Sequence, residues 1–227
     1  MRTVVVVPAY NEEKTVGGVV AAVKSSGLFK EIIVVSDGSK DGTAKAARAA
    51  GATLVHEMPW KHGKGAAMGH GVMHSDSPVI CFFDADLKGL TAEHARAILE
   101  PVASGKMYMH MGLRDRGPFW TALSKRLPMV GGERALRREL FEAIPERYLH
   151  GFKVESALNY FCRINGLPYG LVVLTGLGIV RKMQKVGFGR GLVEYVRMWS
   201  QVFSAMLEVR LARGEFKARG MHMSHHH

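Results

Sequence analysis

The stretch EIIVVSDGSKDGT, residues 31–43, decides the fold of this chain. Its residues 32–35 are β-branched and apolar without alternation, which is typical of a strand buried on both faces. A turn rich in Ser, Asp and Gly follows, and the next residues, TAKAARAA, have the composition of a helix. A buried strand, a polar turn and a helix form the repeating unit of a parallel sheet.

The same unit recurs on both sides of this stretch. Short apolar runs stand at TVVVV (3–7), ATLVH (52–56) and PVICFF (78–83), and helical patterns separate them. LPYGLVVLTGLG, residues 167–178, predicts a last strand. The sequence therefore predicts an α/β fold with a Rossmann-like, mostly parallel sheet flanked by helices.

Composition limits the classes of function. The 227 residues are 47% hydrophobic, enough to bury the core of one catalytic domain. Lys and Arg outnumber Asp and Glu by 31 to 20, a formal net charge of +11, which favours anionic partners. No apolar run approaches the roughly 20 residues that cross a bilayer. Cys81 and Cys162 show no metal spacing, so we expect a cytoplasmic protein with two buried free thiols. Residues 221–227, MHMSHHH, are typical of an expression-tag remnant and stay outside every metal argument.

Polar side chains follow each of the four predicted strands, in the segments PAYNEE, SDGSKDGT, HEMPWKHGKG and DAD. Ligands bind beyond the carboxyl ends of the strands in an open α/β sheet, so we expect these segments to line one crevice. Asp84 and Asp86 of DAD place two carboxylates side by side, and a divalent cation such as Mg²⁺ or Mn²⁺ would relieve their repulsion. The alternative role, capping the next helix, already suits Thr91.

Three further residues of these segments are candidates for binding or capping. Asp37 has no evident local need for its charge, and a carboxylate there suits a base or a ribose. Asp41 suits the N-cap of the following helix. Lys64 stands between two glycines, where a backbone approaches a ligand closely and an ammonium meets a phosphate. The chain has neither a P-loop nor a GxGxxG after its first strand, which argues against a nicotinamide-binding domain.

In order, VVVVPAYNEE, IIVVSDGSKDGT, HGKGAAMGHG and CFFDADL resemble the donor half of the GT-A glycosyltransferases. The resemblance is to the large inverting family, family 2, which includes the dolichyl- and polyprenyl-phosphate sugar synthases, and it covers residues 3 to about 140. It implies a UDP- or GDP-sugar donor and a Mg²⁺ or Mn²⁺ ion held by Asp84 and Asp86. By this resemblance the donor and its metal contact Pro8, Ala9, Tyr10, Glu12, Asp37, Lys64, Gly65, Asp84, Ala85 and Asp86.

The resemblance extends more loosely into GGERALRRELFEAI, residues 131–144, where these enzymes face the acceptor. Gly132 and Arg134 match it, and Arg114 and Arg116 lie where related lipid-phosphate enzymes carry basic residues. Guanidinium groups suit a phosphate-bearing acceptor, while a solvated basic loop is an equal explanation for Arg114 and Arg116.

The expected reaction is one inverting displacement, in which an acceptor oxygen attacks the anomeric carbon while the metal ion neutralises the leaving diphosphate. Asp86, Arg134 and Glu155 are the predicted catalytic residues. Glu155 is the candidate general base for a hydroxyl acceptor, whereas a phosphate acceptor needs no base. The alternative for Glu155 is an acid favoured by the dipole of its helix. Lys88 stands where several relatives have a metal-binding residue, which leaves a third protein ligand open.

Beyond residue 180 the chain is basic and amphipathic. We expect a catalytic domain over 1–180, with the nucleotide sugar in 1–113 and the acceptor in 114–180, and a helical appendage over 181–220. The apolar positions of the appendage recur at helical spacing, at Leu192, Val196, Trp199, Phe203 and Met206. Such a helix suits an anionic membrane surface, the domain's own core or the second subunit of a homodimer.

Two other classes of function compete with this interpretation. A sugar-phosphate nucleotidyltransferase predicts a Gly-rich basic loop straight after the first strand, and PAYNEE is not one. A non-catalytic nucleic-acid- or lipid-binding protein explains the charge but has no use for Asp86. We expect no nucleic-acid partner, and an anionic acceptor: a lipid-linked phosphate at the cytoplasmic membrane face is favoured over a phosphorylated small molecule. No role is assigned to the histidines before the tail, which are His56, His62, His70, His74, His94, His110 and His150.

Overall fold

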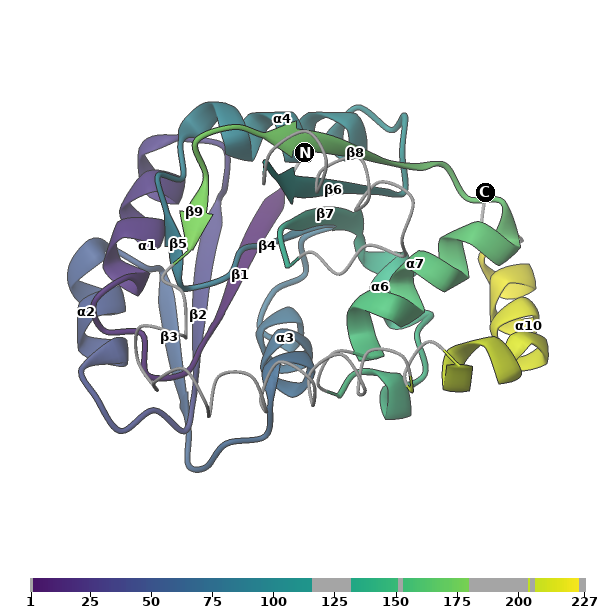
Figure 1. The fold of residues 1–227 in the computed structure, drawn as a ribbon, viewed down its shortest axis with the longest axis horizontal. Coiled ribbons are helices and arrows are strands. Elements are labelled where there is room, and N and C mark those ends of the chain that lie inside the picture. Colours follow the sequence, from purple (N-terminus) through teal and green to yellow (C-terminus); the bar gives the residue numbers. More distant parts are fainter. Residues whose placement is uncertain (1, 116–131, 151–152, 180–203, 205–206, 225–227) are drawn as a thin grey trace.

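A seven-stranded sheet with helices on both faces forms the centre of the molecule (Figure 1). The computed structural model describes residues 2–115, 132–150, 153–179, 204 and 207–224. The strand order is β3-β2-β1-β4-β7-β6-β8. The strands are β1 (Thr3–Ala9), β2 (Glu31–Asp37), β3 (Leu54–Met58), β4 (Val79–Phe82), β6 (Met109–Arg114), β7 (Arg134–Arg137) and β8 (Tyr169–Leu174). The four strands predicted before residue 84 and the predicted last strand are confirmed, whereas β6 was not predicted.

Pairing in the sheet is mostly parallel. β1 runs parallel to β2 and β4, β2 to β3, and β6 to β8, while β7 runs antiparallel to β4 and β6. The register sets Ala9 opposite Ser36 and Ser36 opposite Glu57, so the carboxyl ends of β1, β2 and β3 are level. Because β7 runs the other way, its amino end reaches the edge at which β4 ends, with Arg134 opposite Phe82.

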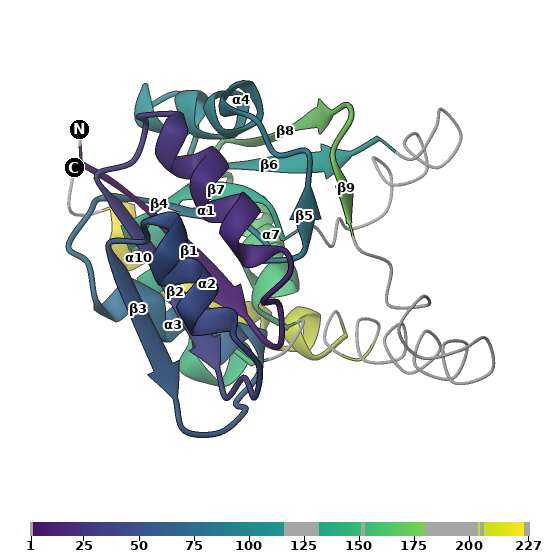
Figure 2. The same cartoon turned by 90° about the vertical axis from the view of Figure 1, so that its left-hand side faces the viewer.

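Alternate residues of β1 serve two separate cores. Val5 and Val7 pack with α1, α2 and α4, and Val4 and Val6 pack with α3, α7 and α10. This alternation explains why the strand is apolar throughout. The two views show the two helical layers on either side of the sheet (Figure 2). The helices are α1 (Val16–Ser25), α2 (Thr43–Ala50), α3 (Lys64–Met73), α4 (Ala92–Ala103), α6 (Arg138–Glu142), α7 (Lys153–Asn165) and α10 (Arg213–Ser224), with a 3₁₀ turn η1 (Glu146–Tyr148).

A second, two-stranded sheet holds the segment that follows DAD. β5 (Leu87–Lys88) pairs antiparallel with β9 (Gly178–Ile179). Leu87 is buried and Lys88 is exposed. The pairing holds the chain immediately after Asp86 against residues 178–179, which follow the last strand of the large sheet.

The C-terminal residues that the structure describes pack on the domain itself. Val209 and Phe216 are buried, and the Phe216 ring contacts Tyr148, Tyr160 and Phe161 at centroid distances of 5.1, 5.8 and 6.0 Å. Packing against the domain's own core was one of the three predicted uses of the appendage. The positions that carried the predicted stripe, Leu192, Val196, Trp199, Phe203 and Met206, lie outside the described residues.

The two cysteines and the start of α2 were also predicted from the sequence. Cys81 and Cys162 are buried free thiols, as predicted. The N-cap of α2 is Gly42 rather than Asp41, and the prediction was wrong by one residue. Asp41 nevertheless serves the helix start, because its Oδ1 accepts a hydrogen bond from the Thr43 N–H at 3.1 Å.

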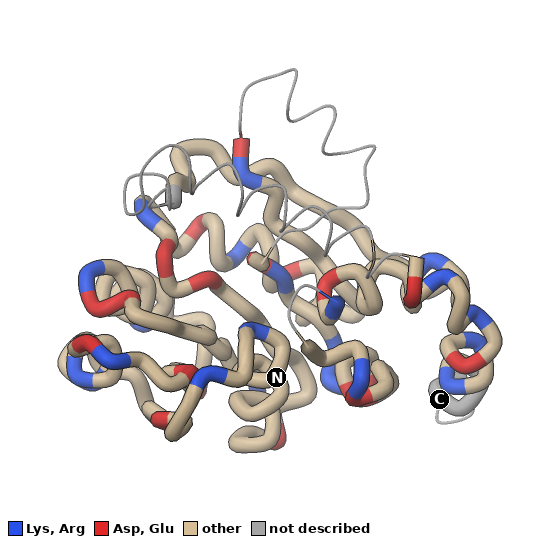
Figure 3. The backbone as a smooth tube through the Cα atoms, turned by 60° about the horizontal axis from the view of Figure 1, so that its bottom comes forward, with Lys and Arg blue, Asp and Glu red and all other residues tan. Residues whose placement is uncertain are grey.

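Charges of both signs are interspersed over the described elements (Figure 3). The positive excess is uneven along the sequence: residues 116–131 and 180–203 contain eight of the 31 Lys and Arg but one of the 20 Asp and Glu. Within the described part of the chain, no helix combines the length and apolar character needed to span a bilayer.

Candidate active site

The polar segments after β1 and β2 bind each other. The Asn11 side chain accepts a hydrogen bond from the Lys40 N–H at 2.8 Å, and Glu13 accepts one from the Gly42 N–H at 2.7 Å. In return, the hydroxyl of Thr43 accepts one from the Glu12 N–H at 2.8 Å. Much of the polarity of PAYNEE and SDGSKDGT therefore serves to hold two adjacent loops together at the edge of the sheet.

Asp37 also has local partners, which corrects the view that nothing nearby needs its charge. Its two oxygens accept hydrogen bonds from the His62 and Gly63 N–H groups at 2.7 and 2.8 Å. The side chain is 3% exposed, and Gly38, in the left-handed region at φ 68°, allows the turn to lie against Trp60 and Lys61. Asp37 thus fixes the loop before α3, and its contact with a base remains a prediction.

Asp84 and Asp86 lie directly beyond β4, and both side chains are partly exposed. Ala85 between them is 3% exposed and packs in the core. Gly132 lies against Asp84, because a Cβ at position 132 would overlap with both carboxylate oxygens of Asp84. The first residues before β7 are therefore in direct contact with the DAD segment.

Lys64 joins two acids from different parts of the chain. Its Nζ lies 2.7 Å from Asp84 Oδ1 and 2.7 Å from Glu155 Oε1. Burial alone would lower the pKa of Lys64, but the two carboxylates raise it above its usual value. The same ammonium outweighs burial and lowers the pKa of Asp84. Glu155 is 2% exposed, so this pair ties the start of α3 to the start of α7.

Asp86 has the opposite electrostatic environment. Burial, followed by the negative charges of Asp84 and Glu12, raises its pKa. Asp84, Asp86 and Glu12 thus lie near one another. Lys64 pairs with Asp84, but no cation among the described residues lies within ion-pair distance of Asp86. Clustered carboxylate oxygens are the ligands that Mg²⁺ and Mn²⁺ prefer, so the residues present fit a divalent ion of this class.

A buried acid that the sequence did not reveal lies immediately before β7. Glu133 is fully buried, its Oε1 is 3.6 Å from Arg114 Nε, and neither oxygen accepts a hydrogen bond from the described residues. Burial and then the charge of Asp84 raise the pKa of Glu133 to about 7. GGER gave no signal for this residue, since an acid beside two glycines is typical of an exposed turn.

Arg134 lies beneath the acids rather than at the surface. It is fully buried, and its Nη1 donates to Asn159 Oδ1 at 3.5 Å. Burial lowers its pKa, while Glu155, Glu133 and Asp84 oppose that shift. These surroundings identify Arg134 as the positive charge under the carboxylate cluster, and its contact with an acceptor stays a prediction.

The loop between β3 and α3 contacts the segment that follows β1. Lys61 Nζ lies 3.8 Å from the centroid of the Tyr10 ring, a cation–π contact that the sequence did not predict. Pro8 and Ala9 end β1 beside β2, with Pro8 opposite Val35. Gly65 has a structural requirement of its own, because a Cβ there would overlap with the backbone carbonyl of Leu149, and its contact with the nucleotide stays a prediction. Of the remaining predicted residues, Arg116 lies outside the described ranges.

Comparison with known sequences gives one consistent result. The family model Glycosyl transferase family 2 matches residues 4–89. The chain is 30% identical over 240 residues to the glucosyl-3-phosphoglycerate synthase of Mycolicibacterium paratuberculosis, a match that covers 89% of this chain and 70% of that protein. The synthase of the same name from Mycolicibacterium smegmatis is 29% identical over 241 residues, with 91% and 77% covered. A 4,4'-diaponeurosporenoate glycosyltransferase of Staphylococcus aureus is 34% identical over 100 residues, 42% of this chain and 26% of that protein.

Solved structures of glucosyl-3-phosphoglycerate synthase from Mycobacterium tuberculosis share the fold. The complex with Mn²⁺, UDP and glucosyl-3-phosphoglycerate has a TM-score of 0.75 and 26% identity, and covers 92% of this chain and 79% of that chain. The complex with Mn²⁺, UDP-glucose and phosphoglyceric acid has a TM-score of 0.75 and 25% identity over the same shares. The complex with Mg²⁺ and UDP has a TM-score of 0.73 and 25% identity, again over the same shares.

Proposed function

This chain belongs to glycosyltransferase family 2 and has the GT-A fold, and we propose that it transfers glucose from UDP-glucose to a hydroxyl group of a small phosphorylated acid. Membership of this family sets aside the nucleotidyltransferase and the non-catalytic binding protein. The observation that carries the proposal is the set of carboxylates at the end of β4, where Asp84 pairs with the ammonium of Lys64 and Asp86 has no such partner among the described residues.

The donor end follows from the residues of the first three strand ends. Tyr10 and Lys61 present a ring and a cation beside the loop that Asp37 fixes, a setting suited to a base and its phosphates. Asp84 and Asp86 would hold Mg²⁺ or Mn²⁺. When bound, such an ion supplies positive charge to the diphosphate that leaves.

Lys64 has a second role in this proposal. In the structure it neutralises Asp84 and Glu155 at once. With Asp84 engaged as a metal ligand, the Lys64 ammonium would be free to turn toward the diphosphate and would keep its ion pair with Glu155.

The acceptor side offers Arg114 beside Glu133, close to the acids of DAD. A guanidinium there suits the phosphate or carboxylate of a small acid. For a hydroxyl acceptor a base is required, and Glu155 remains the candidate: its Oε1 binds Lys64, whereas its Oε2 accepts no hydrogen bond from the described residues. The related complexes contain phosphoglyceric acid or glycerol 3-phosphate, and each of these molecules has a phosphate group and a hydroxyl group.

The lipid-linked acceptor favoured on sequence grounds is the second candidate. It rests on the charge excess in residues 116–131 and 180–203, which also supports association with an anionic membrane surface in the cytoplasm. A flotation assay with anionic and neutral vesicles tests this finer proposal. If the protein does not float with anionic vesicles at low salt, the proposed membrane association is wrong, and the transferase proposal is unaffected.

One assay tests the main proposal. Purified protein with Mg²⁺ or Mn²⁺ is given UDP-glucose or GDP-glucose and, as acceptor, 3-phosphoglycerate, glycerol 3-phosphate or a polyprenyl phosphate. We expect release of UDP with the phosphorylated acid and none with Asp86→Asn. Turnover with the polyprenyl phosphate alone would overturn the choice of acceptor.

The product of the same assay tests the stereochemistry implied by the family resemblance. Glucose is α-linked in UDP-glucose, so a single displacement gives a β-linked product, and its anomeric proton has a larger coupling constant than that of an α-linked product. An α-linked product in the proton NMR spectrum would show the predicted inversion to be wrong.

A further inference from the structure

Three histidines that the sequence left without a role meet outside the active site. His56 lies in β3, His70 lies in α3, and His74 is the residue that ends this helix. One ring nitrogen from each lies within 4.8 Å of the others, and the Nε2 atoms of His70 and His74 are 3.2 Å apart. His56 and His70 are half-buried and His74 is exposed, so the cluster is open to solvent on one side.

The fold brings these side chains together for simple reasons. His70 and His74 are four residues apart and therefore lie one above the other on a single helix face. His56 is opposite Val35 in the sheet, and Val35 packs on the α3 side of the core. The rings of His56 and His70 have a centroid distance of 4.1 Å, and those of His56 and His74 one of 5.1 Å.

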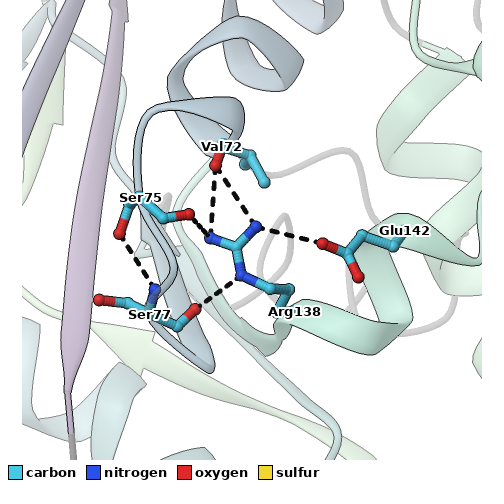
Figure 4. Close-up of polar contacts among 5 residues, drawn as sticks. All are labelled: Val72, Ser75, Ser77, Arg138 and Glu142. Atoms are coloured by element: carbon cyan, nitrogen blue, oxygen red, sulfur yellow. Dashed lines mark hydrogen bonds and ion pairs between the residues drawn. The ribbon is translucent and has the colours of Figure 1, made fainter.

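The end of α3 is held rigidly, which fixes His74. Arg138 donates from Nη1 and Nη2 to the Val72 carbonyl at 3.4 and 3.3 Å, from Nη2 to Ser75 and from Nε to Ser77 at 2.9 Å (Figure 4). His74 lies between two of these carbonyls in the sequence. The backbone on both sides of His74 is therefore tied to one guanidinium group.

The distance between the Nε2 atoms of His70 and His74 is that expected of two ligands of one metal ion, and the third ring nitrogen lies within 4.8 Å of both. Nitrogens bound at 2.0–2.1 Å to a tetrahedral Zn²⁺ lie roughly 3.3 Å from one another, close to the distance between His70 and His74. Without an ion, one of these two imidazoles has to donate its hydrogen to the other. Burial, and then the neighbouring His56 and His74, also lowers the pKa of His70, which favours the neutral, metal-binding form.

We propose that His56, His70 and His74 bind one divalent transition-metal ion of the Zn²⁺ class, with water in the fourth position. Nitrogen ligands favour Zn²⁺, Ni²⁺ or Cu²⁺, whereas the carboxylates of Asp84 and Asp86 favour Mg²⁺ or Mn²⁺. The two sites therefore select different metals in one chain. This site goes beyond the transfer reaction, and its presence or absence leaves the proposed function unchanged.

The ion would act as a cross-link between β3 and α3. The loop that joins these two elements includes His62 and Gly63, whose N–H groups bind Asp37, and it ends at Lys64. His70 lies six residues after Lys64 on the same helix, about 9 Å along its axis. A metal at the cluster would thus restrain the loop beside the donor without contacting the donor itself.

Zinc binding to the 227-residue chain tests the proposal. In every sample His222, His225, His226 and His227 are replaced by Ser, so that the terminal histidines contribute no ligand. Isothermal titration with Zn²⁺ and thermal unfolding are then measured for this parent and for His70→Gln, His74→Gln and His94→Gln. His94 lies in α4, outside the cluster, and serves as the matched control.

We expect one Zn²⁺ per chain more in the parent and in His94→Gln than in His70→Gln or His74→Gln. At about a hundredfold excess of free Zn²⁺ over its Kd, the parent's Tm should rise by roughly 5–10 °C, and the two cluster variants should lose this shift. Equal stoichiometry and equal shifts in all four proteins would overturn the site.

A second measurement covers variants that fail to fold. X-ray absorption at the zinc edge of the parent, loaded with one equivalent, reports the ligands directly. The proposal requires imidazole nitrogens at about 2.0–2.1 Å as the main shell. A first shell of oxygen ligands alone would show that Zn²⁺ binds the carboxylates instead, and the proposal would fall.

Discussion

Lys64 is the residue on which the charge balance of the site depends. It neutralises Asp84 and Glu155 at 2.7 Å each, and Glu155 is almost completely buried. Removing one member of a buried ion pair leaves an uncompensated charge, which is more costly than losing the pair's net attraction. We therefore expect changes at Lys64 to affect both the stability of the chain and the proposed binding of the donor.

We expect Lys64→Met to lower the free energy of unfolding by about 2–3 kcal/mol, less than for a fully buried pair because the Lys64 side chain is 26% exposed. Mg²⁺ with UDP should restore part of this loss, since the metal takes over the charge of Asp84. Urea unfolding with and without Mg²⁺ and UDP checks both statements. Lys45→Met, at an exposed position of α2, should change neither value. A loss that Mg²⁺ and UDP do not reduce would contradict the assignment of Asp84 as a metal ligand.

Glu133 makes stability depend on pH. Its pKa is raised to about 7 in the folded chain from an ordinary value of 4.5. The neutral acid contributes stability that is fully present below about pH 4.5 and is lost as the pH rises through 7. One pKa unit corresponds to about 1.4 kcal/mol, so ionisation of Glu133 lowers the free energy of unfolding by about 3 kcal/mol by pH 8.

We therefore expect Glu133→Gln to lose less stability than the unmodified chain between pH 5 and pH 8. Urea midpoints at the two pH values, without divalent ions, measure the difference. Glu100→Gln, on an exposed position of α4, should follow the unmodified chain. If Glu133→Gln loses as much stability between pH 5 and pH 8 as the unmodified chain, Glu133 is already ionised at pH 5.

At the scale of elements, Arg138 connects two parts of the sheet's supporting layer. It begins α6 and donates to carbonyls of the segment between α3 and β4, and also to Glu142 at 3.2 Å. This segment turns the chain from α3 into β4, immediately before the strand that carries DAD. The guanidinium thus supports both α3 and the strand that leads to Asp84 and Asp86.

Arg138→Met should lower the free energy of unfolding by about 3 kcal/mol, because several backbone carbonyls lose a charged donor at once. Thermal unfolding gives the size of the effect, and Arg96→Met on the exposed face of α4 is the control. A change below about 0.5 kcal/mol would mean that water replaces the guanidinium at these carbonyls.

How well sequence predicts these elements depends on what each strand is made of. β1, β2 and β4 are rich in Val and Ile and were predicted, whereas β6, MHMGLR, has no β-branched residue and was not. The same limit holds for the site. Asp84 and Asp86 followed from a motif at a strand end, but Glu133 and the histidine cluster depend on contacts between segments far apart in sequence, which periodicity does not report.

At the scale of the whole molecule, the C-terminal residues belong to the catalytic domain's core. Phe216 is fully buried against α7 and η1, and Lys153 pairs with Glu208 at 2.7 Å. The surrounding sequence, RGEFKARG, has one apolar side chain of any size, so its burial could not be predicted from a helical stripe. Residues of the predicted appendage therefore pack on the predicted catalytic domain, and the boundary near residue 180 stays a prediction.

Phe216→Ala should lower the free energy of unfolding by about 3–5 kcal/mol, as for other large buried aromatic residues. Leu211→Ala, at a side chain that is 79% exposed, should change it by less than about 0.5 kcal/mol. Urea unfolding of both variants provides the comparison. Equal effects of the two substitutions would show that the C-terminal helix does not contribute to the cooperative core.

The reversed direction of β7 has an evolutionary consequence. β6 ends and β7 begins at the edge of the sheet at which β4 leads into Asp84 and Asp86, so the chain leaves this edge after Arg114 and returns to it at Gly132. Sequence changes confined to residues 116–131 leave the residues of β1, β2, β3 and β4 unchanged. We therefore expect related chains to differ in the second substrate through changes between Arg114 and Gly132, while the four strand-end segments keep the same nucleotide sugar.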